Sequence, residues 1–306
     1  MATLIDQRSE ILFLYEIENA NPNGDPINEN RPRYDTEDSK VLVSDVRLKR
    51  SIRDYFFEYK GYNGSNGKDI FVRETTYAEG DKTYIADGKR RAKAFQDKRE
   101  TVLEQCLDVR LFGGVIPLKN DSITLTGPTQ FQMGKSLHQV EIRTEQGTGA
   151  FASGDKKTKS TFRTEYKVPY ALIGFNGVIN EKAAQYSQMT YEDKNLLLEG
   201  IWEGTKNLIS RSKFGQAPLL LMVIDYKEPY YIGSLRQRLR LDHEKNDLQI
   251  RGTDDYKLDV SALFDELKQQ GDKIAAITLK VDSRLKAVRN EQPYALTTGN
   301  LSLDDL

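Results

Sequence analysis

The sequence predicts an α+β fold in which a single sheet is covered by two helices. Two amphipathic segments of helical period and four apolar, strand-like segments support this prediction, because they alternate along the chain in the order βαββαβ. The 306 residues contain neither an internal repeat nor a low-complexity linker, so we expect one domain over 1–306. Two long polar segments separate core elements and predict large insertions.

The first half of the predicted core is a strand followed by a helix. Residues 11–18 read ILFLYEIE, a short run of strand formers that ends in apolar/acidic alternation. A polar loop leads from this strand to a helical segment, which Ser44 or Asp45 can cap and which ends before Gly61. At about 100° per residue this helix has one apolar face. The residues on that face are Leu48, Ile52, Tyr55, Phe56 and Tyr59.

Three strands and a second helix complete the predicted core. The strands are expected over 123–133, 166–179 and 218–226. The helix begins at Thr190 and Asp193, whose spacing is that of a capping box, and Gly215 is expected to cap its end. Together with the first pair, these elements give the ferredoxin-like order βαββαβ, an arrangement that also serves RNA recognition modules.

The remaining segments are two insertions, 61–121 and 134–165, and a C-terminal part, 227–306. The first insertion is expected to hold a helix over 89–109 that stops at the glycine pair after residue 112. The residues expected on its buried side are Phe95, Val102, Cys106 and Leu107. The second insertion is rich in Gly, Lys and Thr. The C-terminal part predicts a basic strand over 235–241, a helix near 259–270 and a strand near 275–282.

Composition excludes several classes of function. No apolar run approaches the ~20 residues that span a bilayer, and the N-terminus lacks the apolar core of a signal peptide, so we expect a cytoplasmic protein without membrane contact. A single cysteine, Cys106, excludes an internal disulfide and a multi-thiolate metal site. No dinucleotide or Walker motif and no Ser or Cys triad is present, so no cofactor is expected.

Charge is distributed unevenly although its sum is close to zero, at 45 − 46 = −1. Basic residues gather at 47–53, 89–93, 156–159, 211–213 and 236–240. Local basic tracks on a neutral protein favour a defined binding groove over general attraction to polyanions.

The polar loop contains a stretch, NANPNGDPINEN at 19–30, that has the spacing of a calcium loop. Calcium loops of this kind need early carboxylates and a glutamate at the twelfth position. Here the first, third and fifth positions are Asn19, Asn21 and Asn23, and the twelfth is Asn30. The loop therefore predicts no metal site, and its Asn-Pro, Asn-Gly and Asp-Pro pairs predict turns.

Several short motifs taken together resemble one known family. YEIENANPNGDP, NRPR, DVRLKRSIRDY, DVRLFGG and GPTQFQMGKSLHQVE resemble the backbone subunit of type I CRISPR Cascade complexes, a member of the RAMP superfamily, and the type I-B branch most closely. The resemblance covers the order of segments from about 11 to 226 and is weaker in the C-terminal third. It implies an RRM-like palm, fingers or web from 61–121, a thumb from 134–165 and C-terminal strands and a helix, 227–306, packing on the palm.

The resemblance also implies a function. Such a subunit is non-catalytic, and its copies polymerise into a helical filament along the spacer of the crRNA. The filament leaves guide bases open for pairing with target DNA in antiviral defence. The implied partners are the crRNA, the target DNA strand, further copies of the chain and other Cascade subunits. Because such a subunit accepts any guide sequence, it is expected to bind phosphate and sugar.

The expected contact residues follow from the matched motifs and the basic tracks. Those expected at the RNA are Asn21, Asn23, Gly24, Arg31, Arg33, Arg47, Lys49, Arg50, Arg53, Lys135, His138, Arg211 and Lys213. The four cations of the first helix are expected on its solvent side, where its N-terminus favours phosphate. Lys156, Lys157 and Lys159 are expected at the thumb. Arg236, Arg238 and Arg240 are expected on one face of a strand, against target DNA, RNA or the next subunit.

Two alternatives remain open at the level of sequence. A metal-dependent endoribonuclease of the same superfamily would use acids such as Asp25, Asp35 or Asp38. The two histidines, His138 and His243, are candidates for acid–base chemistry, yet neither has an evident partner, which favours structural roles. The other alternative is a ferredoxin-like enzyme whose basic helix binds a phosphorylated small molecule.

Overall fold

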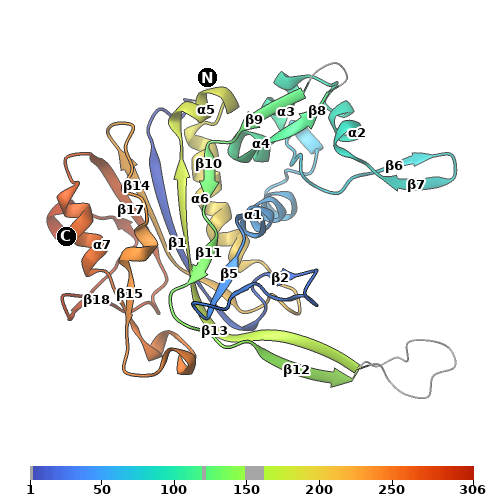
Figure 1. Ribbon diagram of the computed structural model, residues 1–306. Coiled ribbons are helices and arrows are strands. Elements are labelled where there is room, and N and C mark those ends of the chain that lie inside the picture. Colours follow the sequence, from blue (N-terminus) through green and yellow to red (C-terminus); the bar gives the residue numbers. More distant parts are fainter. Residues whose placement is uncertain (1–2, 119–121, 149–161) are drawn as a thin grey trace.

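A ten-stranded antiparallel sheet forms the centre of the protein in a computed structural model that describes residues 3–118, 122–148 and 162–306 (Figure 1). The order along the sheet is β20 (Gly299–Asn300), β17 (Ile274–Val281), β14 (Gln216–Tyr226), β1 (Ser9–Ala20), β13 (Phe162–Ile179), β11 (Gly134–Ser136), β5 (Lys40–Val43) and β4 (Tyr34–Asp35). β10 (Thr129–Phe131) and β12 (Arg143–Thr148) also pair with β13. The predicted α+β class is confirmed.

β1 lies between β13 and β14 and is apolar on both sides. Successive side chains of a strand point to opposite faces. Ile11 and Phe13 therefore join one hydrophobic cluster, whereas Leu12 and Leu14 join another. This double burial explains why the sequence of β1 is a continuous apolar run.

Two helices, α1 (Asp45–Tyr59) and α6 (Tyr191–Lys206), cover the first of these faces. Their axes approach closely because α6 carries glycines: a Cβ at Gly204 would lie 2.8 Å from the carbonyl oxygen of Ser51. The predicted caps are present, with the Ser44 hydroxyl accepting from the Arg47 amide and a capping box at the start of α6. Tyr59, expected on the apolar face, is instead 58% exposed.

The second helix is shorter than predicted. α6 ends at Lys206, and Asn207 rather than Gly215 occupies its C-cap. Gly215 has a φ of +103° and precedes β14, and a Cβ there would lie 2.6 Å from the carbonyl oxygen of Glu18. Position 215 therefore requires glycine, because its backbone lies too close to β1 for a side chain. A short helix, α5 (Glu181–Ser187), precedes α6.

The C-terminal part covers the other face of the sheet. Its helix α7 (Ser261–Gln269) packs Leu263, Phe264 and Leu267 against the cluster that contains Leu12 and Leu14. A second sheet joins β15 (Arg240–Asp242), β16 (Lys257–Asp259), β18 (Ala287–Arg289) and β19 (Gln292–Tyr294) in that order. The predicted strand over 235–241 is wrong, because a 3₁₀ turn at Leu235–Arg238 precedes β15.

The insertion after α1 forms its own small core. It contains β6 (Thr76–Glu79), β7 (Lys82–Ile85), α2 (Gly88–Lys93), α3 (Arg99–Gln105), α4 (Leu107–Phe112), β8 (Gly113–Pro117) and β9 (Ser122–Thr126). The single helix expected over 89–109 is wrong. Positive φ at Gln96 and Asp97 separates α2 from α3, and extended backbone at Cys106 separates α3 from α4. The four residues expected on its buried side are buried.

The strand predicted over 123–133 is also divided. Gly127 and Pro128 separate β9, which pairs with β8, from β10, which joins the main sheet. A Cβ at Gly127 would lie 2.0 Å from the carbonyl carbon of Phe112, so the backbone turns where two segments touch. The short hairpin of β2 (Gly24–Asp25) and β3 (Arg31–Pro32) completes the set of strands.

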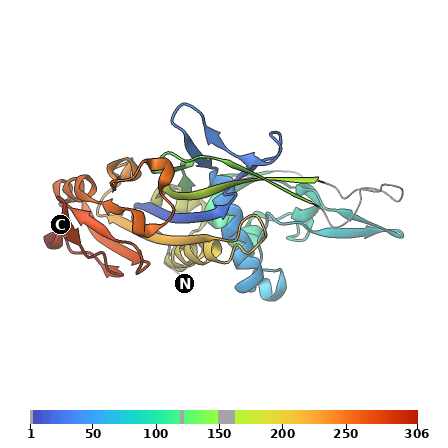
Figure 2. The same ribbon diagram turned by 90° about the horizontal axis from the view of Figure 1, so that it is seen from below.

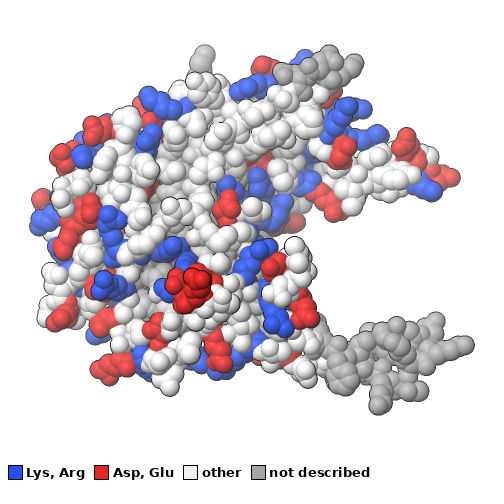
Figure 3. All heavy atoms as spheres, in the orientation of Figure 1, with Lys and Arg blue, Asp and Glu red and all other residues white. Residues whose placement is uncertain are grey.

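Two arms extend from the body in the same direction, away from the C-terminal part (Figures 1 and 2). One is the β6–β7 hairpin, and the other is β12 with the beginning of β13. The surface is hollowed between them, and Lys and Arg side chains gather at the inner end of the hollow (Figure 3). In the ranges that the structure describes, no helix is long and apolar enough to cross a membrane.

Candidate nucleic-acid interface

Three segments that are distant in sequence meet at the N-terminal end of α1. The Asn23 side-chain oxygen accepts a hydrogen bond from the Ser44 amide at 2.8 Å, which joins the loop after β1 to the helix cap. The backbone amide of Asn21 donates to the carbonyl oxygen of Ser212 at 2.8 Å. Lys213 donates from Nζ to the Asn21 carbonyl oxygen at 2.6 Å. The loop after β1, the start of α1 and the segment before β14 thus form one unit.

Two of the predicted cations in this unit have no carboxylate partner among the described residues. Arg47 donates from Nη1 to the Ser51 hydroxyl at 2.7 Å, and Lys213 contacts only the carbonyl of Asn21. Neither side chain forms an ion pair within the described ranges, although both are half-buried. A half-buried cation that no carboxylate contacts is a favourable place for an anion from outside.

Arg47 and Lys213 are both partly withdrawn from water. Burial, with a smaller contribution from the positive charge of Arg47, lowers the pKa of Lys213 to about 8. Burial also lowers the pKa of Arg47. Two neighbouring, partly desolvated positive charges repel each other, and a phosphate placed between them would relieve that repulsion.

The other predicted cations of this region are neutralised by carboxylates. The pairs are Arg31–Glu29 (3.2 Å), Arg33–Asp25 (3.5 Å), Lys49–Asp45 (3.2 Å), Arg50–Asp54 (2.5 Å), Arg53–Asp108 (2.9 Å), Lys135–Asp35 (2.8 Å) and Arg211–Glu165 (3.0 Å). The expectation that all four cations of α1 lie on its solvent side is wrong for Lys49 and Arg53, which are both buried.

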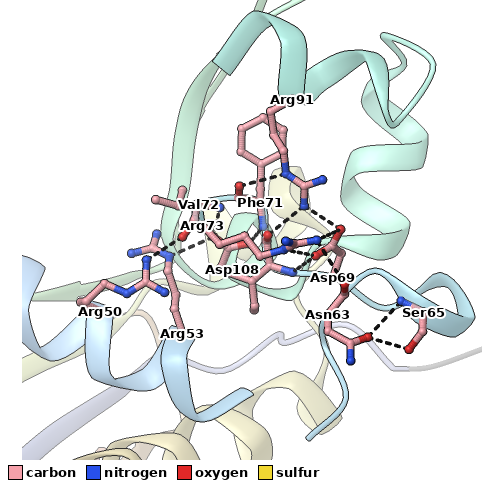
Figure 4. A network of polar contacts seen from close by, with 11 residues as sticks. Arg50, Arg53, Asn63, Ser65, Asp69, Phe71, Val72, Arg73, Arg91 and Asp108 are labelled. Carbon is pink, nitrogen blue, oxygen red and sulfur yellow. Dashed lines mark hydrogen bonds and ion pairs between the residues drawn. The ribbon is translucent and has the colours of Figure 1, made fainter. Parts of the chain in front are cut away.

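Arg53 instead fastens the insertion to α1 (Figure 4). Its Nε donates to the Asp108 carboxylate at 2.9 Å. The same carboxylate accepts from the amides of Phe71 at 2.7 Å and Val72 at 3.0 Å. Arg50 adds a hydrogen bond from Nη1 to the Val72 carbonyl at 2.7 Å. A buried carboxylate with three donors fixes the position of the insertion beside the hollow.

The Asn side chains of the loop serve the protein's own backbone. Asn21 is 3% exposed and Asn23 is 9% exposed, so little of either side chain faces the surface, and their contact with RNA stays a prediction. Gly24 makes room for Asn30, since a Cβ there would lie 1.9 Å from the Asn30 side-chain oxygen. The loop is thus a folded scaffold whose backbone carbonyl, at Asn21, orients Lys213.

The histidines are structural. His138 is 2% exposed, lies 2.9 Å through Nδ1 from the Gln139 carbonyl, and accepts through Nε2 from the Leu172 amide at 3.4 Å. Burial lowers the pKa of His138, which keeps the ring neutral. The expectation that His138 contacts RNA is therefore not supported by its position. His243 pairs with Asp247 at 3.2 Å.

The acids of the loop hold its distal part against β11. Lys135 bonds to the carboxylates of both Asp35 and Asp38, and its hydrogen bond lowers the pKa of Asp35. Asp25 pairs with Arg33. Within the described ranges, no group of three or more His, Cys, Asp or Glu side chains is placed to hold a metal ion.

The predicted row of arginines does not share one face. Arg236 lies across Gly174 and donates from Nη1 to the carbonyls of Met133 at 3.1 Å and Gly174 at 3.0 Å. Arg238 pairs with Glu266 at 3.3 Å, and Arg240 is exposed. Lys156, Lys157 and Lys159 lie outside the described residues.

Two aromatic residues near the cation pair were not predicted. Tyr166 belongs to the arm formed by β12 and the beginning of β13. It lies under Arg31, with 4.4 Å between the guanidinium carbon and the ring centroid. Phe214 is 68% exposed and follows Lys213 directly in the chain. An exposed aromatic residue beside a cation is a signal that the sequence does contain, and it is typical of surfaces on which nucleic-acid bases stack.

Comparisons with known proteins identify the family of the chain. The family model for the CRISPR-associated protein Cas7 matches residues 7–261. The CRISPR-associated protein Cas7 of Haloferax volcanii is 30% identical over 314 aligned positions, which cover 94% of this chain and 89% of that protein.

Solved structures show the same fold at low sequence identity. One chain of a CRISPR RNA-guided surveillance complex is 12% identical, with a TM-score of 0.53 over 93% of this chain and 95% of that chain. A chain of such a complex in a pre-nicking state is 10% identical, with a TM-score of 0.52 over 87% of this chain and 89% of the other. The family match spans most of the sequence and confirms the resemblance of its motifs, so the chain belongs to the CRISPR-associated Cas7 family.

Proposed function

We propose that this chain is a non-catalytic backbone subunit of a type I CRISPR RNA-guided surveillance complex and that it binds the sugar–phosphate backbone of the guide RNA. The observation that carries the proposal is the pair of half-buried cations, Arg47 and Lys213, without a carboxylate partner in the described residues. Such a pair binds phosphate irrespective of base sequence, as a subunit that accepts any guide must do. Family membership supplies the RNA as the source of the phosphate.

The strand order supports an RRM-like palm. The central strands follow the order β14–β1–β13–β11, all antiparallel, with α1 and α6 on one face. This corresponds to the order 4-1-3-2 of the βαββαβ arrangement. RNA recognition modules use the face of the sheet that has no helices. Here α7 covers that face, so we place the RNA at the edge formed by the α1 cap and the loop after β1.

The arms take the remaining roles in this proposal. The insertion 61–121 acts as fingers or web, and 134–165 acts as the thumb that reaches along the guide. Further copies of the chain, other subunits and the target DNA strand then bind around the hollow between the arms (Figure 3). The 30% identical Haloferax protein supports placing the chain in the type I-B branch.

The test is the mass of the protein bound to single-stranded RNAs of increasing length, with and without Mg²⁺. We expect stepwise growth of mass with RNA length, and intact RNA. The variant Arg47→Ala/Lys213→Ala should bind at least about tenfold more weakly, because each charged hydrogen bond contributes about 1.5–3 kcal/mol. Lys286→Ala is the matched control, since Lys286 pairs with Asp254 in the C-terminal part.

Two outcomes would contradict the proposal. RNA cut only in the presence of Mg²⁺ would favour the endoribonuclease alternative. A single small complex at every RNA length, or binding that a mononucleotide saturates, would favour a phosphate-binding enzyme instead.

A further inference from the structure

Two of the arginines expected at the RNA, Arg31 and Arg211, are each one position away from a residue that bonds to Asn21. Arg31 follows Asn30, whose carbonyl oxygen accepts from the side chain of Asn21 at 2.7 Å. Arg211 precedes Ser212, whose carbonyl oxygen accepts from the backbone amide of Asn21 at 2.8 Å. The carbonyl oxygen of Asn21 in turn accepts from the lysine of the cation pair. The two arginines thus belong to the same unit as that pair.

Arg31 is held by a carboxylate and a tyrosine. Its Nη2 donates to Oε2 of Glu29 at 3.2 Å and to the hydroxyl of Tyr166 at 3.0 Å. The Tyr166 hydroxyl donates to the same oxygen of Glu29 at 2.7 Å. These hydrogen bonds, the one from Tyr166 above all, lower the pKa of Glu29, so this carboxylate is charged at neutral pH. Because Tyr166 belongs to the arm formed by β12 and the beginning of β13 (Figure 1), the three side chains join the loop after β1 to this arm.

Arg211 makes a second contact with the same arm. Its Nη2 lies 3.0 Å from Oε1 of Glu165, the residue before Tyr166 in β13. Lys167 also contacts the Glu165 carboxylate, at 3.4 Å. The arm thus contacts both arginine-bearing segments through charged side chains.

The interface between the arm and these two segments is not closely packed. A cavity of about 130 Å³ lies between them, and its walls include residues 164–167 of the arm, Glu29 of the loop and Ser212. Close-packed protein interiors contain few voids larger than a water molecule. At this point the arm is therefore held by polar and charged contacts rather than by apolar packing.

Both ion pairs at the arm are open to water, unlike the buried pair that fastens the insertion. The side chains of Arg31 and Glu29 are 47% and 68% exposed, and that of Arg211 is 70% exposed. Those of Arg53 and Asp108 are 11% and 1% exposed. An exposed ion pair contributes little to stability, because water screens it. Arginine binds phosphate through strong, often bidentate hydrogen bonds, so a phosphate can replace an exposed carboxylate at low cost.

We propose that Glu29 and Glu165 bind Arg31 and Arg211 while the protein is free of RNA, and that phosphates of the guide RNA displace both carboxylates. The two glutamates are then internal competitors of the RNA, and their displacement frees the arm from the loop after β1. The inference rests on the proposed function, which supplies the RNA. Because the exchange involves phosphate alone, it is the same for every guide sequence.

The experiment compares the affinity of the full chain for one single-stranded RNA, at the shortest length that binds, between the wild-type protein and Glu29→Gln/Glu165→Gln. Glutamine keeps the size of each side chain and removes its charge. We expect the variant to bind about threefold to tenfold more tightly, because the RNA no longer has to break two exposed ion pairs. Since Glu29 is largely exposed, Glu29→Gln alone should fold normally and should show part of this gain.

A double-mutant cycle separates displacement from general charge repulsion. In the background Arg31→Gln, the substitution Glu29→Gln should leave RNA affinity unchanged, because the arginine that the glutamate occupies is gone. Removal of a negative charge that merely repels RNA would act equally in both backgrounds. Asp254→Asn is the matched control for net charge, since Asp254 pairs with Lys286 in the C-terminal part, and it should bind RNA as the wild-type protein does.

The outcomes separate the two proposals. Failure of the wild-type protein to bind RNA would overturn the proposed function and this inference with it. If the wild-type protein binds RNA and Glu29→Gln/Glu165→Gln binds it equally well or more weakly, the inference alone is overturned. A gain from Glu29→Gln that persists in the Arg31→Gln background would also overturn the inference alone, because the glutamate would then act by repulsion and not by occupying Arg31.

Discussion

Two arginines of the same helix, Arg47 and Arg53, have opposite surroundings. They are six positions apart in the chain, so their side chains point roughly 120° apart around α1. Arg53 faces the insertion and is neutralised by the buried carboxylate of Asp108. Arg47 faces the segment before β14, where its neighbour is a second cation, Lys213. One side of α1 is built to hold the protein together, and the other side is left charged for a ligand.

The comparison shows that the number of cations on a helix is a poor guide to its binding surface. An ion pair inside the protein satisfies a guanidinium and removes its attraction for phosphate. A cation that is half-buried without a carboxylate costs the fold some stability. A charge that destabilises the fold in this way is typical of a functional site. The unpaired side of α1 is therefore the better candidate for the guide RNA.

The largest effect is expected from breaking the pair on the structural side. Asp108→Asn leaves Arg53 buried with no counter-charge, which should lower the free energy of unfolding by about 3–5 kcal/mol. Urea denaturation measures this change. The control is Asp54→Asn, which breaks the more exposed pair with Arg50 and should cost less than about 1 kcal/mol. Equal losses in the two variants would show that the Arg53 pair does not fasten the insertion.

The charged side should respond in the opposite way. Arg47→Gln removes a desolvated charge, so the free energy of unfolding should stay the same or rise. RNA affinity should fall by about tenfold or more, because a charged hydrogen bond to phosphate is lost. The slope of log affinity against log salt concentration should become shallower by about 0.7, which corresponds to one phosphate on single-stranded RNA. An unchanged salt slope would place Arg47 away from the RNA.

Lys213 predicts a pH dependence within the same unit. Its pKa is about 8 in the folded protein and 10.5 ordinarily, so the unfolded chain binds more protons between these values, and stability should rise with pH across that window. RNA affinity should do the reverse. It should be constant below about pH 8 and fall above it, because phosphate binds the protonated amine. Binding titrations from pH 7 to about 9.5 measure this, and Lys213→Arg should remove the decline, since arginine stays charged. A decline that persists in the arginine variant would assign it to another group.

Much of the fold could be predicted because its signals are local. The apolar run of β1, the Ser44 cap and the capping box at Thr190 each depend on a few neighbouring residues, and all are present. The predictions of secondary structure failed where contact with a distant segment determines the backbone conformation. Gly127 bends next to Phe112, and Gly215 bends next to Glu18, and neither contact can be recognised from the residues around the glycine.

The residues of the candidate site could be predicted from the sequence, but the role of each residue could not. The basic tracks at 47–53 and 211–213 contain both cations of the pair, so residue type and the family motifs were sufficient to select them. Which cations are neutralised depends on partners far away in the chain, such as Asp108 for Arg53. The same holds for Asn21, whose side chain bonds to Asn30 and whose backbone bonds to Ser212 and Lys213.

The smallest effect is expected at Lys49, which composition alone would rank equal to Arg47. Its stem is buried, and its amine pairs with Asp45 one turn earlier and lies 5.5 Å from the centroid of the Phe112 ring. Lys49→Met keeps the packing of the stem and loses a pair that contributes about 0.3–0.5 kcal/mol, so thermal unfolding should change little. The salt slope of RNA binding should equal that of the wild-type protein. A slope as shallow as that of Arg47→Gln would mean that Lys49 leaves Asp45 for the RNA, and the charged side of α1 would then extend to the face that now appears neutralised.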